Sequence, residues 1–476
     1  MAPQGKKRRK GKGRRGRDAP ASPPPPADAA AGADRTDLYV ALGIGLFAFA
    51  LYAVTLGNLY SIDDNLVIYG NEFVEQGFAG IDELLVTPFT YGISEVNDNG
   101  YRPLPMITFA VEVGLFGEQA FVAQHLHHVL IYVVTAILLY TLLARLLRRR
   151  GRSIAIAACL IWVAHPVHTE VVANLKSRDE MLGFLFGLVL TLLLLVRHLD
   201  TGRRRYWALA AGTFFLGLVS KESVVTYVAA IPLCLWTFSE LRLRQIGRLM
   251  LPLLGVVGLY LGIRYAVLSR FPTEEYDLLQ NPLFGANSWD IRHATAIKVL
   301  LHYLRLSVFP HPLVWDYSYN QIPLVDFRDP WVLLSLALHA GLLAVAVARV
   351  RRRCIWAFGI LFYLVTLSIA SNLFIITPSL LGERFLYTPT LSVSIMAALA
   401  LAWLVGSRRQ PFDAALGFRL ALALGVVLLP AGIKTVTRAR QWKDSLTISL
   451  VDIETSPNSI RTTSTPSEAL SRRGEL

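Results

Sequence analysis

Residues 121–152 read FVAQHLHHVLIYVVTAILLYTLLARLLRRRGR, and this stretch shows most clearly how the chain is organised. Polar side chains lie near its start, a long apolar run follows, and an arginine cluster ends it. A run of roughly 20 apolar residues is long enough to span a bilayer. Arginines gather on the cytoplasmic side of such spans. We therefore predict a transmembrane helix over 121–144 whose end enters the cytoplasm at 146–152.

Apolar runs of this kind recur along the whole chain. Hydrophobic residues make up 54% of the sequence and charged residues 17%, a balance that is unusual for a soluble domain. The expected spans are 38–58, 121–144, 153–170, 181–196, 206–219, 223–239, 249–268, 331–348, 355–373, 385–405 and 415–436. The predicted fold class is thus an all-α, polytopic membrane protein with about eleven transmembrane helices. Charged residues 293–309 predict an interfacial or re-entrant helix, and 103–117 a second outer helix.

The placement of arginine predicts the orientation in the membrane. Every second span is followed by a basic loop, at 146–152, 197–205, 242–248, 349–353 and 407–410. The stretch 61–101 instead holds eight acidic residues and no Lys or Arg. By the positive-inside rule, the N-terminus is cytoplasmic and the C-terminus extracytoplasmic.

The same patterns divide the chain into three parts. Residues 1–35 are expected to form a disordered, basic cytoplasmic tail; nine of the Lys and Arg residues lie in residues 1–17, so only +4 of the net charge of +13 remains elsewhere. Residues 36–436 form the predicted transmembrane domain, with an extracytoplasmic loop at 59–120. Residues 437–476 form a short extracytoplasmic segment. No basic face for nucleic acid is expected, and the preference for Arg over Lys favours a bacterial inner membrane over the endoplasmic reticulum.

Charged motifs cluster at the predicted outer ends of the spans. Cations there run against the positive-inside bias: Arg102, Lys176, Arg178, Lys221, Arg264 and Arg384. Each of them either binds an anionic ligand such as a lipid phosphate or pairs with a neighbouring acid. The sequence leaves both alternatives open. Charges at membrane depth are usually functional as a group, but this does not decide the role of any single residue.

The adjacent carboxylates Asp63 and Asp64 begin the acidic outer loop. One carboxylate can accept a proton from an attacking hydroxyl while its neighbour orients a substrate or holds a metal. Such a pair also begins turns and caps helices. Its position at a membrane exit favours the catalytic reading.

Histidines and aromatic residues give weaker signals. The pattern H-x-x-H-x-E of His165, His168 and Glu170 does not match a zinc motif, which favours neutral, hydrogen-bonded histidines. The metal ligands are therefore unknown, and a divalent metal stays open as a cofactor. Trp315, Tyr317 and Tyr319 cluster next to Asp316. Aromatic rings beside a carboxylate suit a sugar face, but Trp and Tyr are enriched at any membrane interface, and these residues alone favour the interfacial interpretation.

The order of the motifs resembles a known family. The motifs are DD (63–64), YRPLPMITF (101–109), QHLHH (124–128), HPVHTEVV (165–172), SKESVVT (220–226), WDYSYNQIP (315–323), SIASNLF (368–374), GERFLYTP (382–389) and RARQWKDSLT (438–447). Their collinear run over most of the chain resembles the membrane region of the transmembrane and tetratricopeptide-repeat O-mannosyltransferases. The resemblance implies a GT-C glycosyltransferase that uses a polyprenyl-phosphate sugar.

The resemblance also implies roles for particular residues. The family's acidic pair, which includes the catalytic base, corresponds to Asp63 and Asp64. The implied substrate-binding residues, together with the outer cations and the aromatic cluster, are Arg102, His165, His168, Glu170, Arg178, Lys221, Glu222, Asp316, Glu383 and Arg384. Two features depart from the family. No 34-residue repeat follows WKD, so acceptor recognition by repeats is either absent or supplied by a repeat-containing partner. The segment KSRDEML (176–182) is also more charged than usual.

These observations predict a membrane glycosyltransferase. It would transfer mannose or another hexose from a polyprenyl phosphate to a hydroxyl of a protein or glycan acceptor, on the extracytoplasmic face and with inversion. A transporter or flippase of a lipid-linked sugar would also place charges inside a helical bundle, but internal repeats are expected there. A non-catalytic membrane scaffold is the third alternative.

Overall fold

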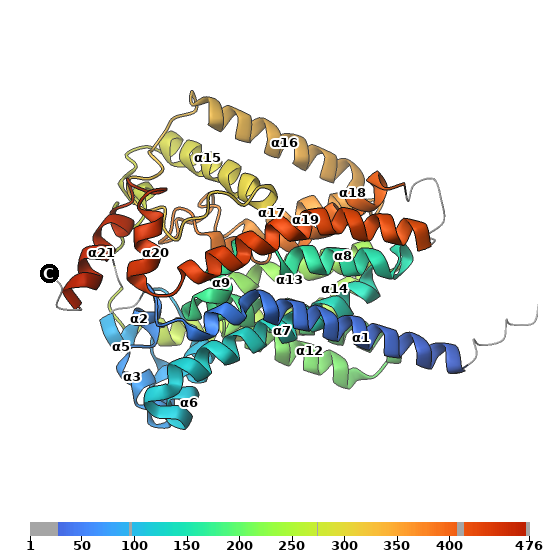
Figure 1. The fold of residues 1–476 in the computed structure, drawn as a ribbon, viewed down its shortest axis with the longest axis horizontal. Helices are drawn as coiled ribbons and strands as arrows, with labels where there is room; N and C mark the ends of the chain where they lie inside the picture. The colour runs from blue at the N-terminus through green and yellow to red at the C-terminus, as the bar shows by residue number, and fades with distance from the viewer. Residues whose placement is uncertain (1–26, 95–97, 274, 407–413, 473–476) are drawn as a thin grey trace, which may run out of the picture. The chain divides into compact units, whose positions relative to one another are not determined.

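The computed structural model describes residues 27–94, 98–273, 275–406 and 414–472. The chain divides into two compact units, residues 1–39 and residues 40–476, and the second unit contains every motif quoted above. Within the described ranges the regular structure is entirely helical (Figure 1). The α-helices are α1 (Ala27–Tyr52), α2 (Asp64–Val67), α3 (Glu72–Glu75), α4 (Ile81–Val86), α5 (Tyr91–Ser94), α6 (Pro103–Phe116), α7 (Ala120–Leu146), α8 (Arg152–Val163), α9 (Thr169–Ala173), α10 (Arg178–Phe184), α11 (Thr191–Thr201), α12 (Arg204–Leu218), α13 (Tyr227–Phe238), α14 (Leu243–Leu268), α15 (Trp289–Val308), α16 (Pro330–Val350), α17 (Ile355–Leu367), α18 (Thr390–Leu404), α19 (Ala414–Gln441), α20 (Ser445–Asp452) and α21 (Ile460–Arg472).

The predicted all-α, membrane-spanning fold class is confirmed, whereas the number of spans is not. In the described residues, six helices are long and apolar enough to cross a membrane, or seven if the bent pair α8 and 166–173 counts as one span. Four shorter apolar helices accompany them: α6, Glu222–Phe238, α17 and α18. The predicted span 206–219 corresponds to α12, which is in neither group, because three arginines precede Tyr206 and shorten its apolar part. Helix α15 is not a candidate span either, in agreement with its charged sequence.

Two predicted boundaries differ from the structure. Residues 27–35, predicted to belong to a disordered tail, are helical and begin α1, while residues 1–26 lie outside the described part. Helix α19 continues to Gln441, past the predicted domain end at 436. It extends because Arg438 is buried and binds both carboxylate oxygens of Asp452, at 2.6 and 2.7 Å, which ties the end of α19 to α20.

Four of the five basic loops meet at one end of the second unit, and the fifth, 407–410, lies outside the described residues. Arg149 lies 2.8 Å from Glu240, and Arg353 lies 3.7 Å from the same carboxylate. Arg145 pairs with Asp200. Four loop regions that the sequence assigns to one side of the membrane are thereby joined. Which side this is stays a prediction.

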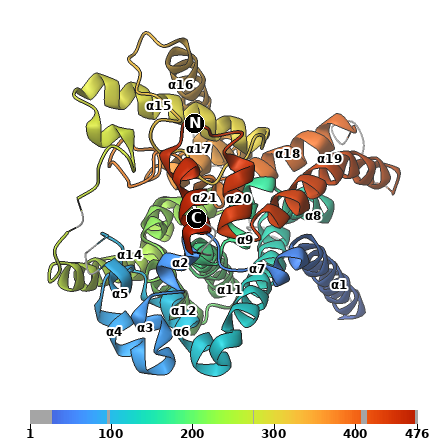
Figure 2. The same ribbon diagram turned by 60° about the vertical axis from the view of Figure 1, so that its left-hand side comes forward.

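Helices α2, α3, α5, α20 and α21 gather at the opposite end (Figures 1 and 2). The backbone N–H of Ile62 donates to Ser445 Oγ at 2.8 Å, and that of Leu59 donates to the Lys443 carbonyl at 2.8 Å. The C-terminal segment is thus packed against the loop that carries the acidic pair.

Small residues bring two charged segments together behind this end. A Cβ atom on Gly217 would lie only 2.5 Å from Cα of Gly187, so α12 can approach the π-helical turn Leu185–Leu190 only because both residues are glycine. The chain leaves α12 just before Lys221, and α10 carries Asp179 and Glu180 about two turns before the glycine contact. The close packing therefore brings Lys221 within reach of both carboxylates.

Candidate active site

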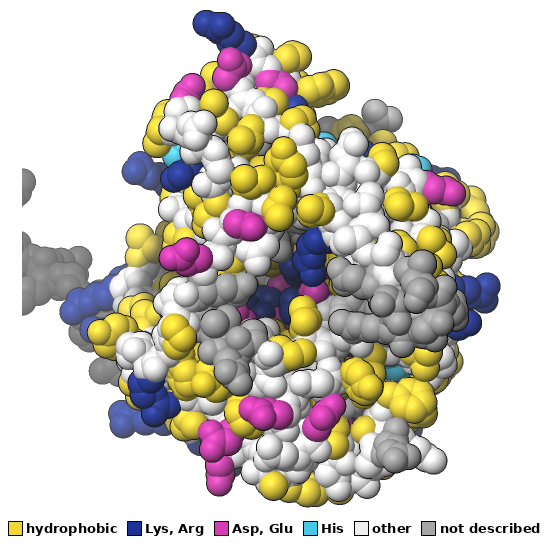
Figure 3. Space-filling model, turned by 90° about the vertical axis from the view of Figure 1, so that its left-hand side faces the viewer, with side chains coloured by type: hydrophobic (Ala, Val, Ile, Leu, Met, Phe, Trp, Pro, Cys, Tyr) yellow, Lys and Arg dark blue, Asp and Glu magenta, His cyan; other side chains and the backbone are white. Residues whose placement is uncertain are grey.

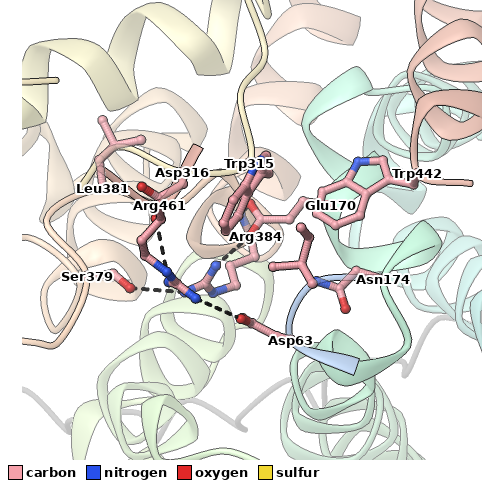
Figure 4. Close-up of a pocket in the computed structure, with 11 residues that line it drawn as sticks. Asp63, Glu170, Asn174, Trp315, Asp316, Ser379, Leu381, Arg384, Trp442 and Arg461 are labelled. Carbon is pink, nitrogen blue, oxygen red and sulfur yellow. Dashed lines mark hydrogen bonds and ion pairs between the residues drawn. The ribbon is translucent and has the colours of Figure 1, made fainter. Parts of the chain in front are cut away.

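A cavity of about 850 Å³ opens at the end that carries α20 and α21. Figure 3 views this end and shows a hollow with Lys, Arg and acidic side chains inside it. Its lining includes charged residues from seven segments far apart in the sequence: Asp63, Arg102, Lys176, Glu180, Lys221, Glu222, Asp316, Arg384 and Arg461. A small polar pocket with eleven lining residues adjoins it, and both are lined by Asp63, Asp316, Ser379, Leu381, Arg384 and Arg461 (Figure 4).

Asp63 faces this pocket from the turn before α2. The preceding residue, Ile62, has a φ of +48°, a conformation that a β-branched residue adopts only under strain. Strain of this kind is often found at functional sites, where the surrounding structure maintains it. Here the conformation of Ile62 directs the side chain of Asp63 toward the cavity.

Asp63 is surrounded by positive charge. Its Oδ1 accepts a hydrogen bond from Arg461 Nη2 at 3.2 Å, and its Oδ2 lies 3.7 Å from Lys176 Nζ. Burial disfavours the ionised carboxylate, but the charges of Lys176, Arg461 and Arg384 outweigh burial and hold the pKa of Asp63 below its ordinary value. Asp63 is therefore an ionised carboxylate in the resting structure.

Asp64 has a different environment from its neighbour. Its side chain is buried, and its oxygens accept hydrogen bonds from the backbone N–H groups of Lys176, at 2.7 Å, and Ser61, at 3.0 Å. Burial raises the pKa of Asp64 to about 7, with a further contribution from the charge of Asp63. Asp64 thus fixes the turn that presents Asp63 and holds Lys176 beside it. It lines neither the cavity nor the small pocket.

Arg384 forms the opposite wall of the small pocket. It lies in the 3₁₀ turn Glu383–Leu386 and contacts Glu170 twice, through its backbone N–H at 2.8 Å and through Nη1 at 2.5 Å. Nη2 donates to Ser379 Oγ at 3.1 Å, as Figure 4 shows. Its buried Nε has no hydrogen-bond partner within the described part of the chain. The guanidinium is thus anchored by one carboxylate and still has a donor to offer.

A second group of charges lines the deeper wall of the cavity. Arg102 binds Asp179 and Glu222, both at 2.8 Å, and Lys221 binds Asp179 at 2.7 Å and Glu180 at 3.0 Å. The extra charges of KSRDEML thus neutralise the two cations of the YRP and SKES motifs.

Several predicted site residues do not reach the cavity. Arg178 is fully buried and pairs with Glu112 at 2.8 Å over the ring of Phe109. His165 Nε2 lies 3.1 Å from the Ser307 carbonyl, and His168 Nε2 lies 2.9 Å from Thr390 Oγ1. Both histidines are buried and hydrogen-bonded, as their pattern suggested.

Glu383 is buried as well. It accepts hydrogen bonds from the Val314 N–H at 2.5 Å and from the Tyr317 hydroxyl at 3.1 Å. Burial raises its pKa to about 8. It joins the loop that carries Trp315 to the turn that carries Arg384, so it supports the pocket from behind.

Sequence reasoning missed three charged residues near the cavity. Asp179 and Glu180 had a usable signal, since acids inside an apolar segment are costly and seldom accidental. Arg461 had none, because it lies in a polar segment after the last recognisable motif. No group of three or more His, Cys, Asp or Glu side chains in the described ranges converges as a metal site would require, and a divalent metal cofactor stays an untested expectation.

Comparisons with known proteins agree with this picture. Residues 102–266 match the family described as dolichyl-phosphate-mannose-protein mannosyltransferase. The chain is 26% identical over 404 residues to protein O-mannosyl-transferase F38B6.6 of Caenorhabditis elegans, which covers 83% of the chain and 55% of that protein. It is 24% identical over 461 residues to protein O-mannosyl-transferase TMTC4 of Homo sapiens, covering 85% of the chain and 60% of that protein.

These matches confirm the predicted resemblance. The chain is a multi-pass membrane protein similar to the transmembrane and tetratricopeptide-repeat O-mannosyltransferases. It spans somewhat more than half the length of these two relatives. The relatives are animal proteins, and the predicted bacterial inner membrane stays a prediction.

Proposed function

We propose that this chain is a GT-C glycosyltransferase that transfers a hexose, with mannose as the first candidate, from a polyprenyl phosphate to a hydroxyl of a protein acceptor on the extracytoplasmic face. The observation that carries the proposal is that an ionised carboxylate, Asp63, shares one cavity with Arg384 and Lys176. Transfer of a sugar from a phosphate to a hydroxyl requires a base and a positive charge close together. A base must face the acceptor hydroxyl, and fixed positive charge must face the leaving group.

The cavity also suits a lipid-linked donor. Besides the charges described above, the lining includes apolar side chains, among them Leu66, Ile93, Phe284, Ile369, Ile376 and Phe385. A polyprenyl phosphate combines an anionic head with a long apolar tail. Its head would lie beside Arg384, and its tail would leave along these apolar side chains toward the membrane.

The proposed reaction is a single displacement. Asp63 accepts the proton of the acceptor hydroxyl as the oxygen forms its bond to the anomeric carbon. The bond from that carbon to the phosphate oxygen breaks, and the polyprenyl phosphate leaves with the electron pair. Attack opposite the leaving group inverts the anomeric configuration.

Arg384 is the best-placed partner for the leaving phosphate. Its planar guanidinium can donate two parallel hydrogen bonds to phosphate oxygens, and the side chain lines both the small pocket and the large cavity. Glu170 keeps the side chain oriented while the phosphate gains negative charge. Interactions of this kind accelerate transfer because they strengthen as charge develops.

A transfer assay tests the proposal. The purified chain in lipid nanodiscs is incubated with labelled polyprenyl-phosphate mannose and a Ser/Thr peptide, and a nucleotide-activated mannose serves as the comparison donor. We expect peptide labelling from the lipid donor only, with the inverted anomer. Folded protein that labels no peptide, but moves the donor between the leaflets of sealed vesicles, would instead identify a flippase.

A further inference from the structure

Two arginines of the C-terminal segment have contrasting surroundings. Arg438 is fully buried and forms a two-pronged contact with Asp452. Arg461, at the start of α21, has a side chain that is 43% exposed and lines both the small pocket and the large cavity. Arg438 therefore holds the segment together, while the contacts of Arg461 point to another role.

The backbone around Arg461 is firmly attached to the loop at Asp316. The Ile460 N–H donates to the Tyr319 carbonyl at 2.7 Å, and Ser459 Oγ donates to Asp316 Oδ2 at 2.6 Å. The guanidinium also lies over the ring of Trp315, with its carbon 5.2 Å from the ring centre. The start of α21 is thus fixed at the mouth of the pocket (Figure 4).

The guanidinium itself is only loosely satisfied. In the described residues its one hydrogen bond goes to Asp63, at 3.2 Å, and its second ion pair, with Asp316, is 3.5 Å long. A guanidinium has five N–H donors, so most of them are free to meet an anion. Lys176 lies 3.7 Å from the same carboxylate, and the charge of Arg384 also acts on it. Arg384 is paired with Glu170 and Arg461 with Asp316, so a bound phosphate would compete with these carboxylates for the two guanidinium groups.

We propose that Arg461 binds the phosphate of the lipid-linked donor together with Arg384, and that this move frees Asp63 to act as the base. The inference rests on the proposed function. In this structure Arg461 donates a hydrogen bond to the carboxylate of Asp63. A donor phosphate in the small pocket competes for the guanidinium, and the carboxylate becomes more basic when that contact is lost. The C-terminal segment thereby links donor binding to activation of the base.

Binding measurements test the first half of the inference. A short-chain polyprenyl phosphate without sugar is titrated into the full chain in nanodiscs, for the wild type, Arg461→Gln, Arg461→Lys and the control Arg440→Gln. Arg440 is exposed on α19 and lines neither pocket. Charge-assisted hydrogen bonds are strong enough that Arg461→Gln should weaken binding roughly 10-fold to 100-fold, and Arg461→Lys less. Arg440→Gln should match the wild type.

The matching polyprenol, which lacks the phosphate, separates the possible results. Its affinity should be equal in all four proteins, since Arg461 contacts only the head group. Wild type that binds polyprenyl phosphate no better than polyprenol would overturn the proposed function itself. Wild-type affinity for the phosphate in Arg461→Gln would overturn only the role of Arg461.

The pH dependence of transfer tests the second half. The groups that face Asp63 are Lys176, Arg384 and Arg461, with Asp64, Glu170 and Asp316 nearby. Loss of the Arg461 contact raises the pKa of Asp63, so the acid limb of kcat, which reports the donor complex, should lie at higher pH than that of kcat/KM. In Arg461→Gln the two limbs should move closer together. A purely structural arginine would leave their separation unchanged, and that result would contradict the inference even if binding or melting temperature had fallen.

Discussion

Two arginine–carboxylate pairs, Arg384 with Glu170 and Arg178 with Glu112, lie near the same end of the molecule and differ in what surrounds them. Arg178 is fully buried and, besides Glu112, binds Thr108 at 2.9 Å and the Gln124 carbonyl at 3.1 Å. Arg384 has a similar carboxylate partner, but its side chain is 13% exposed and lines the cavity. The Arg178 pair is buried, and its guanidinium is bound by protein groups. The Arg384 pair lines a cavity that is large enough for a ligand.

The comparison separates a structural charge from a binding charge. A buried ion pair with no access to solvent positions the segments that it joins. A pair at a cavity wall can exchange part of its contacts for a ligand. The adjacent carboxylates show the same contrast. Asp64 accepts hydrogen bonds from backbone N–H groups, whereas Asp63 faces the pocket.

The largest expected effect is that of Asp63→Asn on transfer. Loss of a general base typically costs 10²-fold to 10⁴-fold, and Asp63 is only partly buried, so the variant should stay folded. Transfer rates and melting curves should be measured beside Asp82→Asn, an exposed acid on α4. Near wild-type turnover in Asp63→Asn would show that Asp63 is not the base. The functional difference between Asp63 and Asp64 would then have no support.

Arg178→Gln should affect stability and not the chemistry. Its loss leaves the buried Glu112 with His127 as its remaining ion-pair partner in the described residues, and breaking a buried pair costs about 3–5 kcal/mol. We expect a large fall in melting temperature, with turnover per folded molecule close to that of the wild type. A variant of normal stability that no longer binds donor would show that the sealed cluster is part of the site.

Arg384 should respond to substitution in the opposite way. Arg384→Lys keeps the charge but not the two-pronged geometry, and we expect donor affinity to fall roughly 10-fold, with a larger fall in Arg384→Ala. Melting temperature should change less than in Arg178→Gln. Equal losses of stability in the two arginine variants, with unchanged donor affinity in Arg384→Ala, would place both pairs in the same structural class.

The smallest expected effect concerns Asp64 and pH. The pKa of Asp64 is raised from an ordinary 3.8 to about 7, so the folded protein holds this proton more tightly than the unfolded chain. The contribution of Asp64 to stability should then decline as pH rises from about 4 to about 7. The difference in melting temperature between the wild type and Asp64→Asn should shrink over that interval. A difference that grows with pH would mean that Asp64 is ionised when folded, like its neighbour.

The sequence predicted the fold class and several residues of the cavity, and it did so for a physical reason. Apolar length and arginine placement are local properties, so the spans around α7 and the meeting of the basic loops could be expected. Asp63, Arg102, Lys221 and Arg384 were found because charges at outer helix ends are costly without a purpose.

The remaining features depend on packing. His168 and Arg178 carry the same sequence signals as the cavity residues, yet their side chains turn toward Thr390 and Glu112. Which side a short helical turn presents depends on neighbours hundreds of residues away. Arg461 reaches Asp63 across 398 positions, a contact that no local pattern announces.

Mapping the donor's position is the most direct test of the claim that this cavity is the transfer site. A short-chain polyprenyl phosphate with a photoreactive diazirine in its second isoprene unit would be cross-linked to the chain in nanodiscs, and the labelled peptides identified by mass spectrometry. We predict labelling of 66–93 and 366–388, both of which line the cavity, and loss of that label when unlabelled polyprenyl phosphate competes. Label confined to helices away from the cavity, such as α16, or insensitive to the competitor, would contradict the account.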